Sequence, residues 1–461
     1  MIARLGLLVS RTIGRFIPDP FILALGLTVF TAVVALLLGF GDMSRGEAAE
    51  ALLEGWWGPG LWAFLKFAMQ MALILVTGFA LAESRPVRGL INAIAQYPRD
   101  SASAAALVGL VAMLAGLLNW GLGLIVGALL ALACARSLQR RSIRAHYPLI
   151  CAAGYTGLLV WHGGLSGSAP LKMSKESEAR DILPESVLAN PEIQAIPLQD
   201  TIFSGLNLFV TLGLLVVVTV VLYLLAPRSD AQIKTATDLG VPEHSDEEDA
   251  VAEEDRAGPI AVALNIIIAL ALLLGMFYYI AFGAGGSGAI GPNEINATML
   301  GLGMLLHVSP LSYVRAVEKA ARGCAGIILQ FPLYAGIMAM MTISGLMAMI
   351  ANFASEHSTT ETLPLFTFVS AGIVNFLVPS GGGQWGVQGP IALQAGAAAG
   401  IAPSKMIMSV AYGDQLTNML QPFWALPLLA ITGIKARDIV GYTAIVMIAA
   451  GIWMALGLLL F

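Results

Sequence analysis

The sequence has few charged residues and few cysteines. Charged residues make up 11% of its 461 residues and hydrophobic residues 57%, whereas a soluble globular domain has about 25% charged residues. This composition excludes an ordinary soluble globular protein. The three cysteines, Cys134, Cys151 and Cys324, stand in apolar surroundings without metal-ligand spacing. We interpret them as small packing residues.

Several diagnostic motifs are also missing. No G-x-x-x-x-G-K-[ST] occurs, which argues against a P-loop ATPase. No H-E-x-x-H occurs and no nucleophile has a base at fixed spacing, so we do not expect an enzyme. The apolar runs do not alternate, which argues against a β-barrel. Near Arg4, Arg11 and Arg15 the apolar stretch is short and lacks a cleavage site. We therefore expect residues 1–19 to be an interfacial segment rather than a signal peptide.

Long apolar runs dominate what is present. Many reach the ~20 residues that cross a bilayer as a helix. The pattern predicts an all-α polytopic membrane protein with lipid as its surroundings and no nucleic-acid partner. We predict about nine transmembrane helices, near residues 20–40, 61–82, 149–170, 203–226, 259–283, 294–308, 325–351, 406–431 and 438–461.

Cationic clusters predict the orientation, because Lys and Arg on short loops stay in the cytoplasm. Five clusters are placed there: Arg4/Arg11/Arg15, Arg85/Arg88/Arg99, Arg136/Arg140/Arg141/Arg144, Arg315/Lys319/Arg322 and Lys435/Arg437. The N-terminus is then cytoplasmic and the C-terminus periplasmic. The segment 102–135 must enter and leave from the cytoplasm, as a re-entrant hairpin or a pair of tight spanning helices. The segment 363–400 starts and ends outside, as a second re-entrant hairpin.

The two halves of the chain share a pattern. "GLLNWGLG" and "GIVNFLVPSGGGQWG" share G-x-x-N, and Tyr155 and Tyr412 follow the two asparagines at nearly equal offsets. With opposite predicted orientations, this indicates an inverted-topology repeat, an architecture common in transporters. The predicted organisation is an N-terminal segment 1–19, a first repeat 20–226, a disordered acidic linker 227–258, a connecting helix 259–283 and a second repeat 294–461.

Polar residues and glycines interrupt both hairpins at their centres. Irregular backbone at membrane depth survives only when it is buried in protein or lines a cavity. Glycine amides and a helix N-terminus suit a carboxylate. "GGLSGS" resembles another unwound segment, and the role of His162 stays open between substrate donor, titrating group and structural partner. The candidate substrate-binding residues are Asn119, Trp120, His162, Ser166, Ser168, Asn375, Ser380, Gly381, Gly382, Gly383, Gln384, Trp385 and Gln388.

Asp414 is the only acidic residue well inside a predicted span. Such a carboxylate is costly and indicates function. Asp414, Thr417, Asn418 and Gln421 have the spacing of one helical face, which suits Na⁺, a proton on the carboxylate, or a structural hydrogen-bond network. The candidate coupling-ion residues are Asn119, Asn375, Asp414, Thr417, Asn418 and Gln421, with Na⁺ as a possible bound ion and no other cofactor expected.

Neither hairpin tip contains a cationic residue. A ligand with several carboxylates would usually need Arg or Lys. This absence favours a small ligand with one negative charge and an apolar tail. Trp120, Trp161, Trp385 and Trp424 are candidates to pack on that tail or to serve as ordinary packing residues.

The runs "VPSGGGQWGVQGPI" and "YGDQLTNMLQPFWALPLL" resemble the short-chain fatty acid transporter family, the AtoE-type permeases. "NWGLGLIVGALLA" and "GYTGLLVWHGGLSGSAPL" resemble it too. The resemblance covers nearly the whole chain. It implies scaffold and transport domains, paired hairpins and a homodimer in the bacterial inner membrane. It also implies ion-coupled uptake of short-chain monocarboxylates such as acetoacetate and butyrate, with an elevator-like motion by analogy with relatives.

Other functions stay open at this point. The nearest alternative is a transporter of another organic anion, such as a dicarboxylate. A cation/proton antiporter would use Asp414 as its proton carrier. An intramembrane enzyme built on His162, Asp414 or Ser380 is the remaining class.

Overall fold

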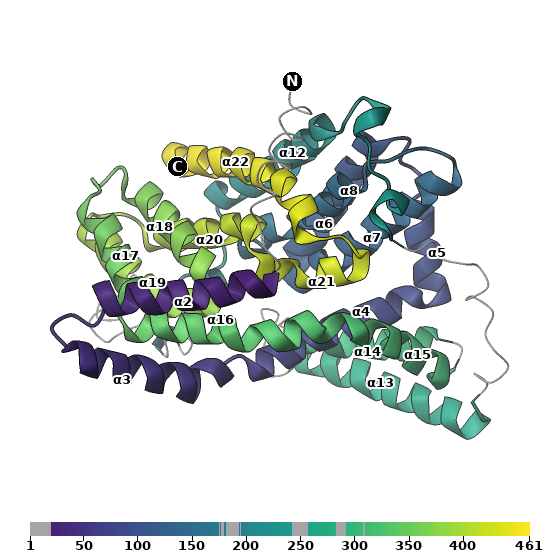
Figure 1. Ribbon diagram of the computed structural model, residues 1–461, viewed down its shortest axis with the longest axis horizontal. Coiled ribbons are helices and arrows are strands. Elements are labelled where there is room, and N and C mark those ends of the chain that lie inside the picture. The colour runs from purple at the N-terminus through teal and green to yellow at the C-terminus, as the bar shows by residue number, and fades with distance from the viewer. Residues whose placement is uncertain are drawn as a thin grey trace.

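The chain folds as an assembly of helices (Figure 1). The computed structural model describes residues 20–174, 176, 179–180, 193, 195–241, 257–282, 292–307 and 309–461. The helices are α2 (Pro20–Leu38), α3 (Arg45–Gly55), α4 (Leu65–Glu83), α5 (Arg85–Ile94), α6 (Ser101–Leu118), α7 (Trp120–Arg140), α8 (Tyr147–Gly154), α9 (Ser168–Met173), α12 (Gly205–Leu225), α13 (Pro259–Phe282), α14 (Pro292–Leu306), α15 (Pro310–Ala321), α16 (Ala325–Ile343), α17 (Leu346–Glu356), α18 (Leu363–Leu377), α19 (Gly381–Ala398), α20 (Pro403–Thr417), α21 (Pro422–Thr432) and α22 (Ala436–Leu460).

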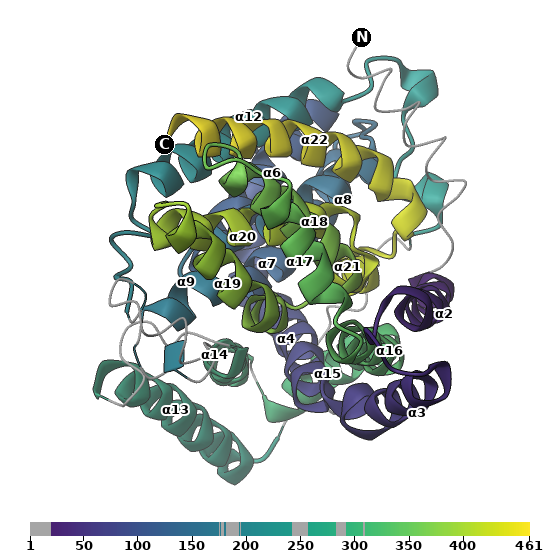
Figure 2. The same ribbon diagram turned by 90° about the vertical axis from the view of Figure 1, so that its left-hand side faces the viewer.

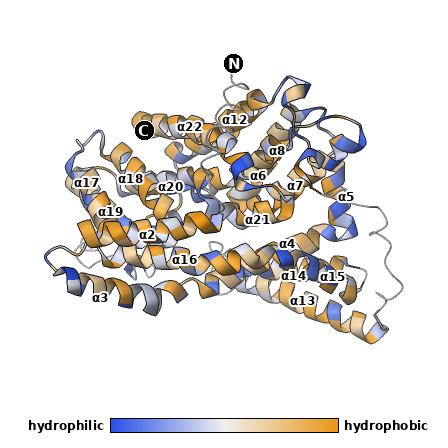
Figure 3. Ribbon diagram, viewed as in Figure 1, coloured by the Kyte–Doolittle hydropathy of each residue, from blue (hydrophilic) through white to orange (hydrophobic). Residues whose placement is uncertain are grey.

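The fold is that of a multi-pass membrane protein. Eight of the described helices are long and apolar enough to cross a membrane, and both α6 and α7 are among them. Orange, the colour of hydrophobic residues, predominates along α13 and α22 in Figure 3. In α13 the only buried residue is Ala269, so nearly its whole apolar surface points outward, as lipid contact requires. The predicted all-α polytopic fold is confirmed. Whether the two hairpins are re-entrant stays a prediction.

The helices form two groups. Figures 1 and 2 both show α2, α3, α4, α13, α14, α15 and α16 on one side of the molecule. The hairpins, the broken helices that follow them, α12 and α22 lie on the other side. We call these the lower group and the upper group. All predicted site residues belong to the upper group.

Each hairpin is two helices joined by a short break. Asn119 alone separates α6 from α7, and residues 378–380 separate α18 from α19. α6 begins at a capping box in which Asp100 and Ser103 satisfy each other's backbone amides. Close packing holds the first hairpin, because α7 and α8 meet at Gly127 and Gly154 with no side chain between their backbones.

A broken helix follows each hairpin. α8 continues as the 3₁₀ turns Thr156–Leu159 and Trp161–Gly163 before α9 begins. α20 continues as the turn Asn418–Leu420 before α21 begins. Pro422 has no N–H to donate to the Asn418 carbonyl, so α20 cannot continue as a regular helix. The Asn418 carbonyl instead accepts from the Tyr155 hydroxyl at 2.8 Å and from the Gln421 amide at 3.0 Å.

The two broken helices lie antiparallel, as three hydrogen bonds show. Residue numbers increase along the first broken helix in the direction in which they decrease along the second. The bonds run from the Tyr147 hydroxyl to the Thr432 carbonyl (2.7 Å), from the Tyr155 hydroxyl to the Gln421 carbonyl (2.7 Å) and from the His162 amide to Gln415 Oε1 (3.0 Å). This register is what two repeats of opposite direction would produce.

Three local predictions need correction. The predicted span 149–170, beyond which we expected an external loop over 171–200, does not end the packed part of the chain, because α9 buries Ala169 and Met173 in a core shared with Trp385. The predicted helix 325–351 is split between α16 and α17 at Gly345, whose φ of 78° is left-handed. Residues 227–241 of the linker are ordered rather than disordered, since the Lys234 amide donates to His146 Nδ1 and the Lys234 carbonyl accepts from the Tyr147 amide. The acidic runs of the linker and residues 1–19 lie outside the described residues.

Gly127→Ala is predicted to destabilise the protein. A methyl group there would overlap the Gly154 carbonyl, and overpacking costs about 1–3 kcal/mol. The apparent melting temperature in detergent should fall. Gly26→Ala in α2 is the matched control, because its methyl group would meet nothing within 4 Å. Equal melting temperatures for the two variants would contradict the close packing of α7 on α8.

Candidate functional site

The tip of the first hairpin is closed by its own side chains. Asn119 Oδ1 accepts from the amides of Gly121 at 2.9 Å and Leu122 at 3.3 Å. Ser166 Oγ accepts from the Trp120 amide at 3.0 Å. The first amides of α7 are therefore satisfied within the protein. In this conformation Asn119 and Ser166 act as caps, and their predicted part in ligand binding stays a prediction.

The tip of the second hairpin is capped less completely. Ser380 Oγ accepts from the Gly383 amide at 3.2 Å, and the Ser380 carbonyl accepts from the Gln384 amide at 2.7 Å. Within the described part of the chain, the amides of Gly381 and Gly382 have no acceptor. These two amides point out of the positive end of an 18-residue helix, which makes this tip the better place for an anion.

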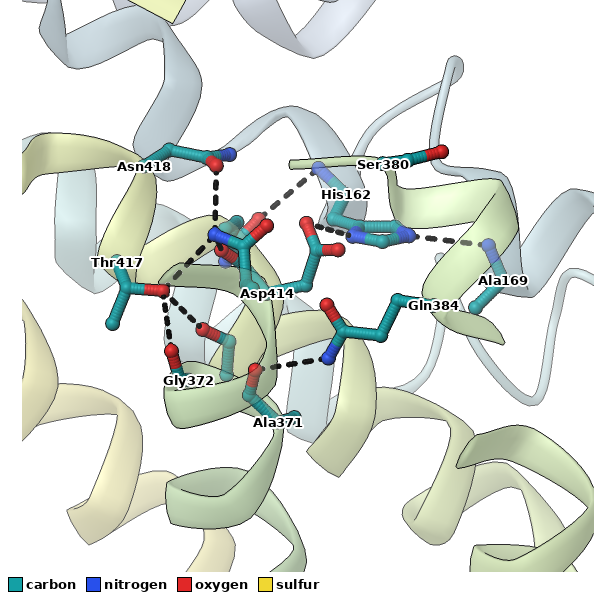
Figure 4. A network of polar contacts seen from close by, with 12 residues as sticks. His162, Ala169, Ala371, Gly372, Ser380, Gln384, Asp414, Thr417 and Asn418 are labelled. Carbon is teal, nitrogen blue, oxygen red and sulfur yellow. Dashed lines mark hydrogen bonds and ion pairs between the residues drawn. The ribbon is translucent and has the colours of Figure 1, made fainter. Parts of the chain in front are cut away.

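His162 and Asp414 form a buried pair beside that tip (Figure 4). His162 Nδ1 lies 3.2 Å from Asp414 Oδ1, and His162 Nε2 accepts from the Ala169 amide at 3.1 Å. An acceptor at Nε2 must carry a lone pair, so the ring proton is on Nδ1 and is donated to Asp414. His162 is therefore neutral in this conformation. Trp161 stacks on its ring with centroids 4.2 Å apart.

Asp414 has a second oxygen that points toward the tip. A Cβ built on Gly381 would lie 3.4 Å from Asp414 Oδ2 and 3.0 Å from His162 Cε1. Asp414 is 1% exposed, and Oδ2 has no hydrogen-bond partner in the described structure. A buried carboxylate oxygen without a hydrogen bond is costly. This oxygen is therefore suited to a proton, a cation or a hydrogen-bond donor.

Asn375 ties the second hairpin to the break after α20. Its Nδ2 lies 2.7 Å from the Asp414 carbonyl, 3.0 Å from Thr417 Oγ1 and 2.9 Å from Asn418 Oδ1. Gln421 Nε2 donates to the Phe376 carbonyl at 2.8 Å. The hairpin and the broken helix thus form one hydrogen-bonded unit around Asp414.

The four polar residues from Asp414 to Gln421 do not share one helical face. α20 ends at Thr417 and the chain turns before Pro422, because Pro422 has no N–H with which to continue the helix. The prediction of a continuous helix was wrong on this point. The structure nevertheless brings these residues together with Asn375, because the turn folds back onto α18.

Several buried side-chain oxygens in this unit lack a hydrogen-bond partner in the described structure. Oxygen atoms are the ligands that hard cations prefer. The unpartnered oxygens are Asn375 Oδ1, Gln384 Oε1, Asp414 Oδ2 and Gln421 Oε1.

A lysine reaches the second tip, contrary to the sequence prediction. Lys172 stands in the last turn of α9, and its Nζ lies 3.4 Å from the position of a Cβ built on Gly382. The prediction failed because the chain beyond residue 170 was expected to leave the membrane as a loop. α9 instead turns back and packs on α19 and α20. Only this tertiary contact brings a cation to the tip, so no local sequence signal indicated it.

The unwound segment 160–167 connects the two tips. Ser166 binds the first tip through Trp120, whereas His162 and Trp161 pack against Gly381 of the second. Asn207 supports the segment by donating from Nδ2 to the Gly163 carbonyl at 2.8 Å.

The remaining candidates have structural contacts. Gln384 Nε2 donates to the Ala371 carbonyl and to Gln388 Oε1, and Gln388 Nε2 donates to Ser370 Oγ, each at 2.9 Å. The bonds to Ala371 and Ser370 join α19 to α18. Trp385 is fully buried. Trp120 packs against Trp424, with ring centroids 5.1 Å apart, and Ser168 begins α9.

A separate cavity of about 1730 Å³ lies between the two groups of helices. Leu75 and Leu329 line it from the lower group, and Leu129 and Leu426 line it from the upper group. Of the lining residues that the structure describes, eight are cationic and Glu83 alone is acidic. The cavity therefore opens at the end of the molecule that the charge pattern assigns to the cytoplasm. None of the predicted site residues lines it.

Two solved transporter structures show a distant likeness in fold. One is Neisseria gonorrhoeae MtrF, described as illuminating a class of antimetabolite efflux pumps. It is 14% identical, with a TM-score of 0.39 and coverage of 98% of this chain and 97% of its own. The other is the Alcanivorax borkumensis YdaH transporter. It is 16% identical, with a TM-score of 0.43 and coverage of 96% of this chain and 97% of its own.

Sequence comparison gives a closer match. The profile of the family described as "Short chain fatty acid transporter" matches residues 1–461. A relative from Escherichia coli K12 is 38% identical over 461 residues, covering 100% of both chains. A relative from Haemophilus influenzae is 36% identical over 457 residues, covering 97% of this chain and 98% of its own. Both relatives are named, provisionally, as short-chain fatty acid transporters. With a family match along its whole length, this chain belongs to the short-chain fatty acid transporter family.

Proposed function

We propose that this protein is a secondary active transporter of short-chain fatty acid anions of the acetoacetate or butyrate type. It takes them up across the bacterial inner membrane, driven by Na⁺ or H⁺. Family membership supports the substrate class. The proposed coupling rests on one observation. Asp414 Oδ2 is a buried carboxylate oxygen without a hydrogen-bond partner in the described structure, and it lies next to the tip of the second hairpin.

The coupling follows from the shared position of cation and anion. A substrate carboxylate at the Gly381 and Gly382 amides lies beside Asp414 Oδ2. Two like charges about 4 Å apart repel by about 4 kcal/mol at the effective dielectric constant of a protein. A proton or Na⁺ on Asp414 removes this repulsion. The cation therefore raises the affinity for the anion, and by linkage the anion raises the affinity for the cation to the same extent.

The same proposal includes the wider architecture. The antiparallel register of the two broken helices supports an inverted-topology repeat, with the first half at 20–226 and the second at 294–461. The lower and upper groups correspond to the scaffold and transport domains of an elevator-like transporter. We further propose a homodimer, with a cytoplasmic N-terminus and a periplasmic C-terminus.

A cation/proton antiporter is the second candidate, because the same Asp414 oxygen would serve it. It differs in needing no organic anion. A dicarboxylate transporter would need a cation for each carboxylate of its substrate. An intramembrane enzyme finds less support, since Ser380 Oγ is held by the Gly383 amide in the cap of α19.

Purified protein in liposomes should accumulate labelled butyrate or acetoacetate when a Na⁺ or H⁺ gradient is imposed. Comparing the two gradients identifies the coupling ion, and competition with C4 dicarboxylates tests the substrate class. No uptake under either gradient would refute the proposed function. Sodium-dependent pH changes in vesicles without organic anion would favour the antiporter instead.

Asp414→Asn should abolish gradient-driven accumulation, because the amide cannot bind a proton and binds Na⁺ more weakly than a carboxylate. If the variant still binds substrate, exchange of labelled for unlabelled substrate will persist without accumulation. Asp42→Asn, at an exposed position in a loop, should behave as the unaltered protein does. Full accumulation by Asp414→Asn would refute the role of this carboxylate.

His162→Asn should slow uptake without changing its pH profile. The asparagine amide can still donate to Asp414, whereas the Ala169 amide loses its acceptor. His357→Asn, at the exposed end of α17, is the control. A shifted pH profile in His162→Asn alone would identify His162 as a proton carrier and contradict its assignment as a neutral donor.

A further inference from the structure

We propose that Lys172 is the residue that anchors the carboxylate of the substrate. This inference rests on the proposed function and adds to it a binding residue with a defined role. The anchor consists of the Lys172 ammonium group and the amides of Gly381 and Gly382 at the start of α19.

The position of Lys172 is set by the packing of α9. Ala169 and Met173, three residues before and one residue after Lys172, are buried against the core around Trp385. This leaves the lysine side chain half-buried and directed toward Gly382, 3.4 Å from a Cβ built there. Among the described residues no carboxylate forms an ion pair with Lys172. A cation at a helix N-terminus without a carboxylate partner is suited to an anionic ligand.

Asp414 provides the second, independent indication of a ligand. Its unpartnered Oδ2 faces Gly381, the neighbour of the glycine that Lys172 faces. Lys172 and Asp414 are not paired with each other. A substrate carboxylate can place one oxygen at the ammonium group and the amides. Its other oxygen then accepts a hydrogen bond from protonated Asp414 or shares a Na⁺ with it.

The charges at the tip also define the substrate class. With a proton or Na⁺ on Asp414, Lys172 is the one uncompensated charge that the described residues place beside these glycines. One carboxylate neutralises it. A second carboxylate on the same substrate would be desolvated without a cation to offset the loss of its hydration. The anchor thus selects monocarboxylates over dicarboxylates, and carboxylates over neutral amides of the same shape.

The test measures initial rates of butyrate uptake into liposomes, with butyramide as a competitor. In Lys172→Gln the KM for butyrate should rise about 10- to 100-fold, the loss expected for a hydrogen bond to a charged group. The preference for butyrate over butyramide should fall by a similar factor. Lys172→Arg should recover part of the affinity. Lys66→Gln, at an exposed position on α4, should change neither value.

A second pair of variants tests the amides. A methyl group on Gly382 would make only an ordinary contact with Lys172, whereas one on Gly386 in the same helix would meet nothing within 4 Å. Gly382→Ala should therefore fold, yet raise the KM because it covers the approach to the amide. Gly386→Ala should leave the KM unchanged. Melting temperatures of all variants show that they are folded.

The two hypotheses fail differently. If the unaltered protein takes up no monocarboxylate, the proposed function is refuted and the anchor falls with it. If it does, and folded Lys172→Gln keeps both its KM and its preference for butyrate over butyramide, the anchor alone is refuted. A raised KM in Lys172→Gln with an unchanged preference would also overturn it, because a merely structural lysine gives that result.

Discussion

Backbone groups inside a membrane must find partners within the protein, and this constraint organises the whole upper group of helices. Both broken helices leave carbonyl and amide groups that lipid cannot satisfy. Each break is met by residues of the opposite half. The Tyr155 hydroxyl serves the carbonyls of Asn418 and Gln421 in the second break. In the first break the His162 amide donates to Gln415 Oε1 of the second half. The halves therefore stabilise each other only when they lie antiparallel.

The same arrangement gives the two hairpin tips different roles. The first tip is fully capped by Asn119 and Ser166, so it anchors the unwound segment that carries His162. The second tip leaves two glycine amides facing Asp414 and Lys172. The two halves share a sequence pattern but differ in which tip amides already have an acceptor. Only amides without an acceptor can bind an anion. This asymmetry favours the second hairpin as the main part of the proposed substrate site.

The local features of the site could be predicted from the sequence because they depend on residue type. A carboxylate at Asp414 and three glycines in a row are conspicuous inside apolar segments. The break at Pro422 was predicted less well, because the helical spacing of Asp414 to Gln421 suggested one continuous face. Lys172 was missed altogether, since its role depends on α9 folding back onto α19. Likewise the proton position on His162 depends on the Ala169 amide, a contact that spacing alone does not reveal.

Aromatic rings of the described residues pack across the boundary between the two groups. Within the upper group hydrogen bonds such as those of Tyr155 join the halves, and within the lower group Gln70 bonds Asn293 and Asn296. Across the boundary Phe67 packs on Trp120 and Trp424, and Phe331 packs on Phe423.

Phenyl rings need no hydrogen-bond partner, so no hydrogen bond of theirs is broken when one packed surface slides past another. All predicted site residues, and Lys172 with them, belong to the upper group. A displacement of that group as one body would therefore carry the Asp414 oxygen, the glycine amides and the ammonium group together. Substrate and cation would keep their mutual contacts during the movement, which is the requirement that coupling places on an elevator-like transporter.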